Sequence, residues 1–183
     1  MYQTERLVLR NWTNDDLTPC IALNQDPAVM EFFPHPYTAE ETIAAVERFK
    51  QHLIDYGFTM YACEFKSNQQ FIGLVGLRYC DFAAKFTPCV EIGWRLAKEY
   101  WGQGLAVEAA SRCLAIGFDQ FKLEEIVSFT AKINKRSERI MQKLGMVHQE
   151  QDNFFHPKLP FNHPLSLHVL YRMNKVAWLK QQS

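Results

Sequence analysis

The sequence predicts an α+β fold, in which helices flank a central, mixed and mostly antiparallel sheet. Two observations lead to this prediction. Segments that alternate apolar and polar residues are separated by short polar links, which is typical of antiparallel strands. Other segments repeat apolar residues every three or four positions, which is typical of helices that pack on one face. The 183 residues contain no obvious linker or internal repeat, so we expect residues 1–183 to form a single domain.

Strand-like segments recur along the chain. The first of them places Leu7 and Leu9 on one side and Val8 and Arg10 on the other. Three segments near the middle of the chain are joined by short links, which predicts an antiparallel meander. The predicted strands cover residues 6–12, 58–65, 70–79, 87–96, 125–131, 146–154 and 166–173.

The predicted helices have recognisable ends. Thr38 and Glu41 form a capping box at the start of one helix. Asn134 suits the N-cap of another, and Gly145 suits the residue just beyond its end. The predicted helices cover residues 14–24, 39–54, 103–120 and 134–144, and a short helix ends the chain.

Composition narrows the class of protein. Twenty basic residues balance twenty acidic ones, so we expect no general nucleic-acid partner. No run of about 18 apolar residues suits a membrane span, and the charged start "MYQTERLVLR" lacks the apolar core of a signal peptide. We therefore expect a cytoplasmic protein without a membrane partner. Five cysteines with no Cys-x-x-Cys pair predict free thiols rather than disulfides or a zinc site.

Two glycines, Gly102 and Gly104, stand where a helix begins in "KEYWGQGLAVEAA". The first amides of a helix lack internal partners and carry partial positive charge. Glycines remove the Cβ atoms that would keep a phosphate group away from them. Nothing matches a P-loop, and the dinucleotide fingerprint needs a third glycine where Val107 stands. The pattern on its own fits either an anion site or an ordinary helix entry.

The surrounding residues carry a more specific pattern. The chain reads "EIGWRLAKEYWGQGLAVEA" and, about thirty residues later, "NKRSERIMQKLGM". Together these stretches resemble the GNAT superfamily of N-acetyltransferases, in particular the branch of ribosomal-protein N-terminal acetyltransferases (RimJ/RimL type). The resemblance extends over essentially the whole chain. It implies the GNAT acyl-CoA N-acyltransferase fold and acetyl-CoA as co-substrate, with no metal.

The resemblance also implies an acetyl-CoA site. Backbone amides of the glycine loop would hold the pyrophosphate, and the strand before it would bind the pantetheine arm through its main chain. Asn134 would contact the same arm, and Ser137 would lie near the sulfur. The cofactor-binding residues implied in this way are Trp94, Arg95, Leu96, Trp101, Gly102, Gln103, Gly104, Leu105, Ala106, Val107, Asn134 and Ser137.

The predicted reaction is direct transfer of acetyl to a primary amine, because a bound amine and thioester need no enzyme-linked intermediate. A backbone amide between Trp94 and Leu96 would stabilise the oxyanion. Glu91 is the candidate base, with a structural ion pair as the alternative. Ser137 is the candidate acid for the CoA thiolate, with Tyr171 as its rival and helix capping as the structural alternative.

Several questions stay open at this level. The acceptor is either a protein N-terminus or a small-molecule amine, and the oligomeric state is undefined. A non-catalytic acyl-CoA-binding protein on the same fold is the alternative function, while the missing third glycine disfavours a nucleotide-binding oxidoreductase. The spacing of His156, His163 and His168 fits no usual metal-ligand set, so we interpret them as loop structure or lining of the acceptor pocket.

Overall fold

A computed structural model describes residues 1–182, and the chain falls into two units. The first unit contains Met1–Arg78 and Gly93–Cys113, and the second contains Tyr79–Ile92 and the residues after Cys113. Two strands and one helix pass from one unit into the other. The prediction of one domain over residues 1–183 stays a prediction.

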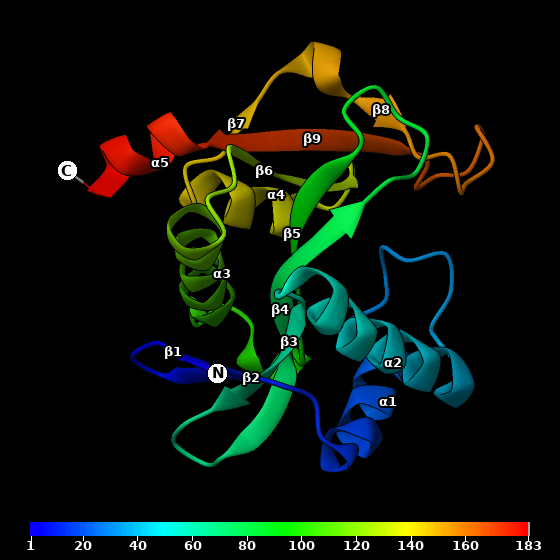
Figure 1. Cartoon of the computed structure of the whole chain (residues 1–183). Helices are drawn as coiled ribbons and strands as arrows, with labels where there is room; N and C mark the ends of the chain where they lie inside the picture. The colour runs from blue at the N-terminus through cyan, green and yellow to red at the C-terminus, as the bar shows by residue number, and fades with distance from the viewer. Residues whose placement is uncertain (183) are drawn as a thin grey trace. The chain divides into compact units, whose positions relative to one another are not determined.

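The first unit is built on antiparallel strands and two helices. Strands β1 to β4 pair in sequence order, so each strand lies beside the next. Helices α1 and α2 lie side by side (Figure 1). The bounds are β1 Tyr2–Gln3, β2 Leu7–Arg10, η1 Asn14–Asp16, α1 Leu17–Gln25, α2 Ala39–Tyr56, β3 Met60–Phe65 and β4 Gln70–Cys80.

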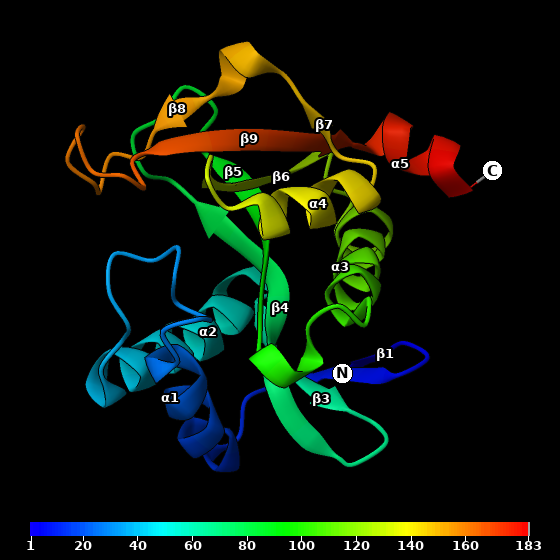
Figure 2. The same cartoon turned by 180° about the vertical axis from the view of Figure 1, so that it is seen from behind.

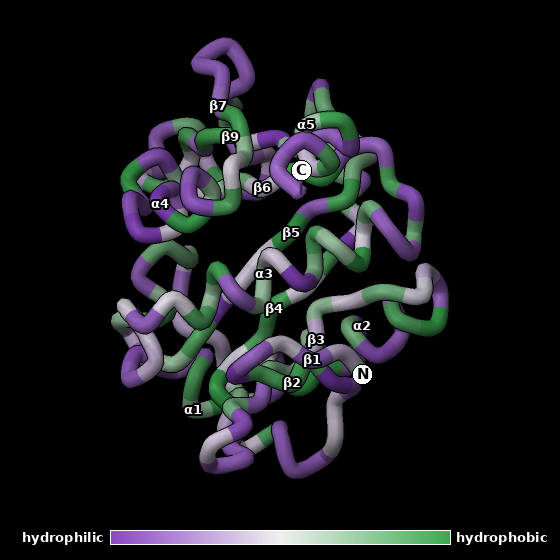
Figure 3. Tube along the Cα trace, turned by 90° about the vertical axis from the view of Figure 1, so that its left-hand side faces the viewer, coloured by the Kyte–Doolittle hydropathy of each residue, from purple (hydrophilic) through white to green (hydrophobic). Residues whose placement is uncertain are grey.

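The alternation of apolar residues along β2 decides which side chains are buried, as predicted. Leu7 and Leu9 on β2 are fully buried, whereas Val8 and Arg10 are partly exposed. Figure 3 shows β2 and β4 mainly in the colour of hydrophobic residues. Trp12 joins this core and donates its indole N–H to the Met60 carbonyl at 2.7 Å. The buried indole therefore has the partner that it needs.

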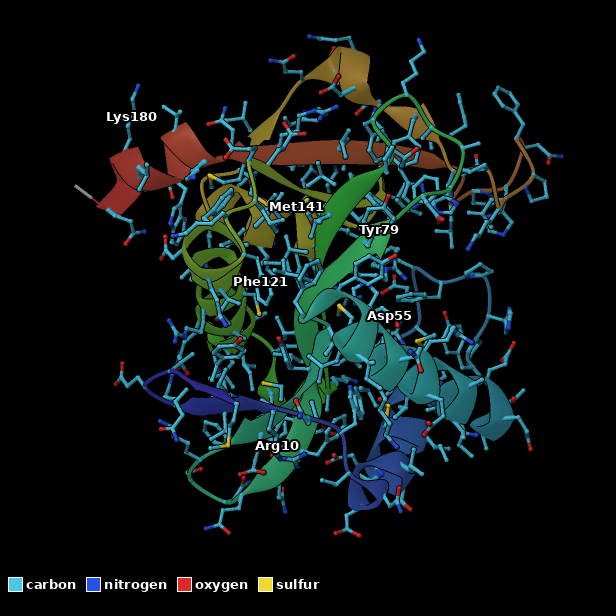
Figure 4. All side chains as sticks on the ribbon, in the orientation of Figure 1. Arg10, Asp55, Tyr79, Phe121, Met141 and Lys180 are labelled. Carbon is cyan, nitrogen blue, oxygen red and sulfur yellow. The ribbon has the colours of Figure 1, made fainter. Side chains whose placement is uncertain are left out.

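A charged network at the end of β2 fixes the start of α1. Arg10, labelled in Figure 4, donates from Nη1 and Nη2 to the two carboxylate oxygens of Asp16 at 2.7 and 2.8 Å. Its Nε donates to Glu64 on β3 at 2.7 Å. Asp16 also accepts from the Thr13 amide. Burial alone would raise the pKa of Asp16, but the hydrogen bonds from Arg10 and Thr13 outweigh it and lower that pKa.

We expect Asp16→Asn to lower the free energy of unfolding by about 2 kcal/mol at pH 7, because the buried Asp16 side chain loses its charge-assisted hydrogen bonds to the partly exposed Arg10, which keeps Glu64 as its other partner. Since the folded-state pKa of Asp16 is lowered, its stabilisation is present above the ordinary pKa of about 3.9. It is lost as the pH falls through the lower, folded-state pKa. Urea unfolding at pH 7 and at acid pH measures this. Exposed Asp15→Asn is the control, and equal losses in both variants would contradict the prediction.

The second unit combines one parallel strand pair with antiparallel ones. β5 runs parallel to β6, and β6 pairs antiparallel with β9 over seven residues. Helix α4 lies beside β6 and β9 (Figure 2). The bounds are β5 Cys89–Leu96, η3 Ile116–Gln120, β6 Glu125–Ala131, α4 Lys135–Lys143, β7 Val147–His148, η4 Glu150–Asp152, β8 Phe154–Phe155, β9 Leu167–Asn174 and α5 Lys175–Gln182. The resulting fold is mixed and mostly antiparallel with flanking helices, as predicted.

Two predicted elements are wrong in detail. The strand predicted at 146–154 is two short strands, because β7 and β8 pair with opposite ends of β9 and the turn η4 between them leaves the sheet. The helix predicted at 103–120 begins at Leu105 and ends at Ala115, after which the chain forms a π-helical turn. The start shifts because both glycines adopt left-handed backbone angles that no helix contains.

The described residues, 1–182, include no helix that is both long and apolar enough to cross a membrane.

Candidate active site

The glycine loop of the first unit links the turn η2 (Lys98–Tyr100) to helix α3 (Leu105–Ala115). Gly102 has φ of +75° and Gly104 has φ of +80°, a region that residues with a Cβ atom rarely adopt. A Cβ atom added at Gly102 would meet nothing within 4 Å. Gly102 is therefore required by the backbone angle, and the space above it is open.

The loop presents a row of amide donors. In the part of the chain that the structure describes, the N–H groups from Gly102 to Val107 donate to no protein acceptor. The first amide of the helix that does so is that of Glu108, which donates to the Gly104 carbonyl at 3.0 Å. These donors lie at the positive end of the helix dipole. The arrangement suits a phosphate or pyrophosphate group.

Arg6, which the sequence analysis missed, holds this loop in place. Its Nη1 donates to the Gln103 carbonyl at 3.0 Å and its Nε donates to the Glu108 carboxylate at 2.6 Å. Glu108 also accepts from the Arg6 amide and the Thr4 hydroxyl. Because the N–H and C=O of a trans peptide point in opposite directions, the bond to the Gln103 carbonyl directs the Gly104 amide away from Arg6. Only long-range pairing reveals this role, since Arg6 lies about a hundred positions away in sequence.

The side chains of Trp101 and Gln103 also stabilise the loop. The Trp101 indole donates to the Leu96 carbonyl at 2.7 Å, and Gln103 Nε2 donates to the Glu99 carbonyl at 2.9 Å. Both residues belong to the predicted cofactor set. Their side chains are engaged with the backbone of the loop, so any contribution of Gln103 to cofactor binding rests on its amide.

Arg95, on β5, packs among residues of the first unit. Its guanidinium lies 4.1 Å from the ring centre of Phe33 and donates to the Asn24 side chain. Burial lowers the pKa of Arg95. The backbone of Arg95 lies very close to that of Gly73 on β4. A Cβ atom at Gly73 would lie only 2.1 Å from the Arg95 carbonyl oxygen. Glycine is therefore required at position 73, because β4 and β5 lie too close there for a side chain. The sequence analysis did not identify this requirement.

Glu91 belongs to the second unit and is almost fully buried, with 9% of its surface exposed. It accepts a hydrogen bond from the Cys80 thiol at a distance of 3.4 Å between Sγ and Oε2. On β5 it pairs in parallel with Val127 of β6. A buried carboxylate beside a thiol is compatible with a proton-accepting role.

Asn134 and Ser137 form the start of α4, as predicted. Asn134 Oδ1 accepts from the Ser137 amide at 3.2 Å, and Asn134 Nδ2 donates to the Thr130 hydroxyl at 2.9 Å. The cap uses the amide of Ser137 and not its hydroxyl. Among the described residues, nothing hydrogen-bonds to Ser137 Oγ, so this hydroxyl is available to a ligand.

Tyr171, the rival acid, lies on β9 with its hydroxyl already engaged. It donates to Glu138 at 3.1 Å and accepts from Gln142 at 3.2 Å. Burial raises the pKa of Tyr171. Tyr171 pairs with Ser128, one position along from Val127, so it points to the opposite face of the sheet from Glu91. Tyr171 therefore shares its face with α4.

The three candidate histidines do not form one group. The rings of His156 and His168 lie 5.0 Å apart, centre to centre, and are tilted by 46°. His163 instead accepts from the Leu165 amide at 3.1 Å within its own loop. The predicted site residues are thus divided between the units. The first holds Trp94–Leu96 and Trp101–Val107, and the second holds Glu91, Asn134, Ser137 and Tyr171.

Comparisons with known proteins agree with this geometry. The sequence model described as "Acetyltransferase (GNAT) domain" matches residues 6–147. The chain is 28% identical over 144 residues to the uncharacterized protein YkkB of Bacillus subtilis, which covers 78% of this chain and 83% of that protein. It also resembles the crystal structure of a GNAT-family acetyltransferase from Bacillus anthracis, with a TM-score of 0.77, 23% identity, and 95% and 98% of the two chains covered. Spermidine N-acetyltransferase from Vibrio cholerae, in complex with CoA and spermine, gives a TM-score of 0.73 at 22% identity and covers 95% of this chain and 98% of that chain.

Proposed function

The chain belongs to the GNAT acetyltransferase family, and we propose that it transfers acetyl directly from acetyl-CoA to a primary amine, either a small molecule or a protein N-terminus. The observation that carries this proposal is the row of unpartnered amides from Gly102 to Val107 beside an open space. This row fits the pyrophosphate of CoA. A solved neighbour of the same fold is a spermidine N-acetyltransferase bound to CoA and spermine, which supports an amine acceptor.

In this proposal the backbone of Trp94, Arg95 and Leu96 binds the pantetheine arm as an added strand would. The same segment supplies the amide that stabilises the oxyanion. Gly102 to Val107 bind the pyrophosphate. Asn134 contacts the arm through the second lone pair of Oδ1 or the second hydrogen of Nδ2, since the Ser137 amide and the Thr130 hydroxyl engage one of each.

The proton balance assigns two separate tasks. An acceptor amine is protonated at neutral pH, with a pKa of about 8 for an α-amine and about 10.4 for a lysine-like amine. One proton must leave before the amine attacks, and we assign its removal to Glu91 through a water. The second nitrogen proton leaves as the C–S bond breaks, and the CoA thiolate gains a proton. Ser137 is the proposed donor for the thiolate, and the second nitrogen proton restores the Ser137 hydroxyl.

We expect Ser137→Ala to slow turnover about tenfold or more while acetyl-CoA still binds. The cap of α4 survives because it uses the Ser137 amide. Tyr171→Phe is the matched comparison and should stay within about threefold of the wild-type rate, because its hydroxyl is committed to Glu138 and Gln142. Steady-state release of CoA thiol measures both variants. A slow Tyr171→Phe beside a normal Ser137→Ala would reverse the assignment.

A ligand titration tests the proposal itself. Melting temperature is measured with acetyl-CoA, NAD and ATP side by side, since a ligand that binds only the folded state raises it. We expect acetyl-CoA alone to raise it strongly, and CoA release to follow when an amine is added. Binding of acetyl-CoA without transfer to any amine would favour a non-catalytic acyl-CoA-binding protein instead.

Two narrower parts of the proposal rest on sequence. The stretches "WGQGLA" and "DNFFHPKLPFNHPLSLHVLYR" support the RimJ/RimL-like branch of the family. The free state of the five cysteines supports a reducing, cytoplasmic location.

A further inference from the structure

Six partly buried rings gather on the Glu91 side of the second unit. Their centres are separated by 4.8 Å at the closest pair and by 5.0 Å between the two histidines. They come from the link between β4 and β5, from β6, from β8 and the residue that follows it, and from β9. This aromatic–histidine cluster consists of Phe82, Phe86, Phe129, Phe154, His156 and His168.

Strand register places this cluster on the same face as Glu91. Glu91 pairs with Val127, and Ala131, four positions further along β6, pairs with His168. Residues an even number of positions apart on one strand point to the same face, and paired residues share it. Glu91 and His168 therefore lie on one face, and Tyr171 lies on the other.

The tautomer of His168 is fixed by its neighbour. Its Nδ1 lies 3.1 Å from the Ser166 carbonyl oxygen, which can only accept, so Nδ1 carries the hydrogen. The same carbonyl accepts the His156 amide at 2.8 Å, and the Ser166 hydroxyl donates to the Phe161 carbonyl at 2.8 Å. In the neutral ring Nε2 then holds a lone pair. Within residues 1–182 this atom has no hydrogen-bond partner.

The surroundings keep this ring neutral. Burial lowers the pKa of His168 below its ordinary value of 6.5, although the Ser166 carbonyl and the Glu91 carboxylate act in the opposite direction. Glu91 on β5 and His156 in the loop after β8 are the titratable groups that face it. The side chain is only partly buried, so a ligand can reach it. His168 thus presents an unprotonated nitrogen on the face of the sheet that also carries Glu91.

We propose that His168 is the catalytic base of the acetyl-transfer reaction, taking the proton of the acceptor ammonium through Nε2, and that Glu91, on the same face of the sheet, assists through its charge instead of removing that proton itself. This inference rests on the proposed function. An N–H bond of the ammonium breaks, directly or through a water, and an Nε2–H bond forms. The free amine then attacks the thioester. The imidazolium returns its proton to solvent after the product leaves, which accounts for the single proton released per turnover.

The different roles of Glu91 and His168 follow from the acidities of a carboxyl group and an imidazolium. A carboxylate with an ordinary pKa of about 4.3 is poorly matched to an amine with a pKa of about 8 to 10. An imidazole lies closer to the working pH, where general-base catalysis is most efficient. The negative charge of Glu91 attracts the ammonium and stabilises the imidazolium that forms.

The test is His168→Asn, with His163→Asn as the matched control. Asparagine keeps a donor for the Ser166 carbonyl and removes the Nε2 lone pair. His163 lies in the same C-terminal segment but makes only a local hydrogen bond. The kcat/KM is measured from pH 5 to 9 with two acceptors, spermidine and an alanine-starting peptide. We expect His168→Asn to reduce kcat by about 100-fold. We also expect the acid side of the pH profile of kcat/KM to change, while the Kd of acetyl-CoA stays the same.

A second measurement is independent of any variant. Proton–nitrogen NMR of the wild-type protein reports the tautomer and the titration of His168, and we expect hydrogen on Nδ1 and a midpoint below 6.5. A His168 that carries hydrogen on Nε2 or is protonated at pH 7 would overturn the inference. An active wild type whose folded His168→Asn variant keeps its rate and acid limb would overturn it as well. A wild type inactive toward every amine would remove the proposed function and this inference together.

Discussion

Gly102→Ala is expected to weaken acetyl-CoA binding by at least about tenfold, which corresponds to roughly 1.4 kcal/mol. At φ of +75° a Cβ atom costs about 1–2 kcal/mol, so the loop relaxes and its amides turn away from their common direction. The new methyl group also enters the open space above the loop, where no protein atom lies within 4 Å. Calorimetric titration of acetyl-CoA into wild type and variant measures the loss.

Gly57→Ala separates this effect from strain alone. Gly57 ends α2 at φ of +78°, so it carries the same left-handed backbone in the same unit but has no proposed contact with the cofactor. Both variants should lose a similar free energy of unfolding, and only Gly102→Ala should lose affinity. Equal acetyl-CoA affinity in the two variants would show that the glycine loop does not hold the pyrophosphate.

Local signals predicted the parts of the fold that depend on neighbouring residues. The capping box of Thr38 and Glu41 marks the start of α2, and Asn134 caps α4 through the Ser137 amide, as the sequence indicated. Gly145 has φ of +76°, which fits the residue beyond a helix end. The strand at 125–131 has the predicted bounds. In each case residues within one turn determine the geometry.

Features that depend on distant pairing were missed. The segment 146–154 was predicted as one strand, yet only the residues near its two ends pair with β9, because the register of β9 decides which residues pair. The support that Arg6 gives to Gln103 and Glu108 spans about a hundred positions. Gly73 is needed where two backbones approach closely. None of these leaves a short-range pattern in the sequence.

In the candidate site, too, local features were predicted from the sequence and features that depend on distant pairing were missed. The Gly-x-Gly pattern indicated either an anion site or an ordinary helix entry, and the structure gives both glycines left-handed backbone angles. The sequence left His168 as one of three similar histidines. What distinguishes it is the Ser166 carbonyl at Nδ1 and the shared face with Glu91, and both arise from the pairing of β9 with β6.

Glu91→Gln is expected to lower kcat about 100-fold while the acetyl-CoA Kd changes less than about twofold. Glutamine has almost the same shape, and its oxygen still accepts from the Cys80 thiol, so the fold is retained. The charge that attracts the ammonium and favours the imidazolium is lost. Initial rates with saturating acetyl-CoA and a varied amine separate this effect from weaker cofactor binding.

Glu125→Gln is the matched control, because Glu125 lies in the same unit and forms an exposed ion pair with Arg172 at 2.7 Å. Its rate should stay near that of the wild type. NMR adds a readout that does not depend on catalysis: the Glu91 charge raises the pKa of His168, so Glu91→Gln should shift the His168 midpoint to lower pH and Glu125→Gln should not. A His168 midpoint that is the same in all three proteins, together with a normal Glu91→Gln rate, would remove Glu91 from the proposed base and leave the cofactor site intact.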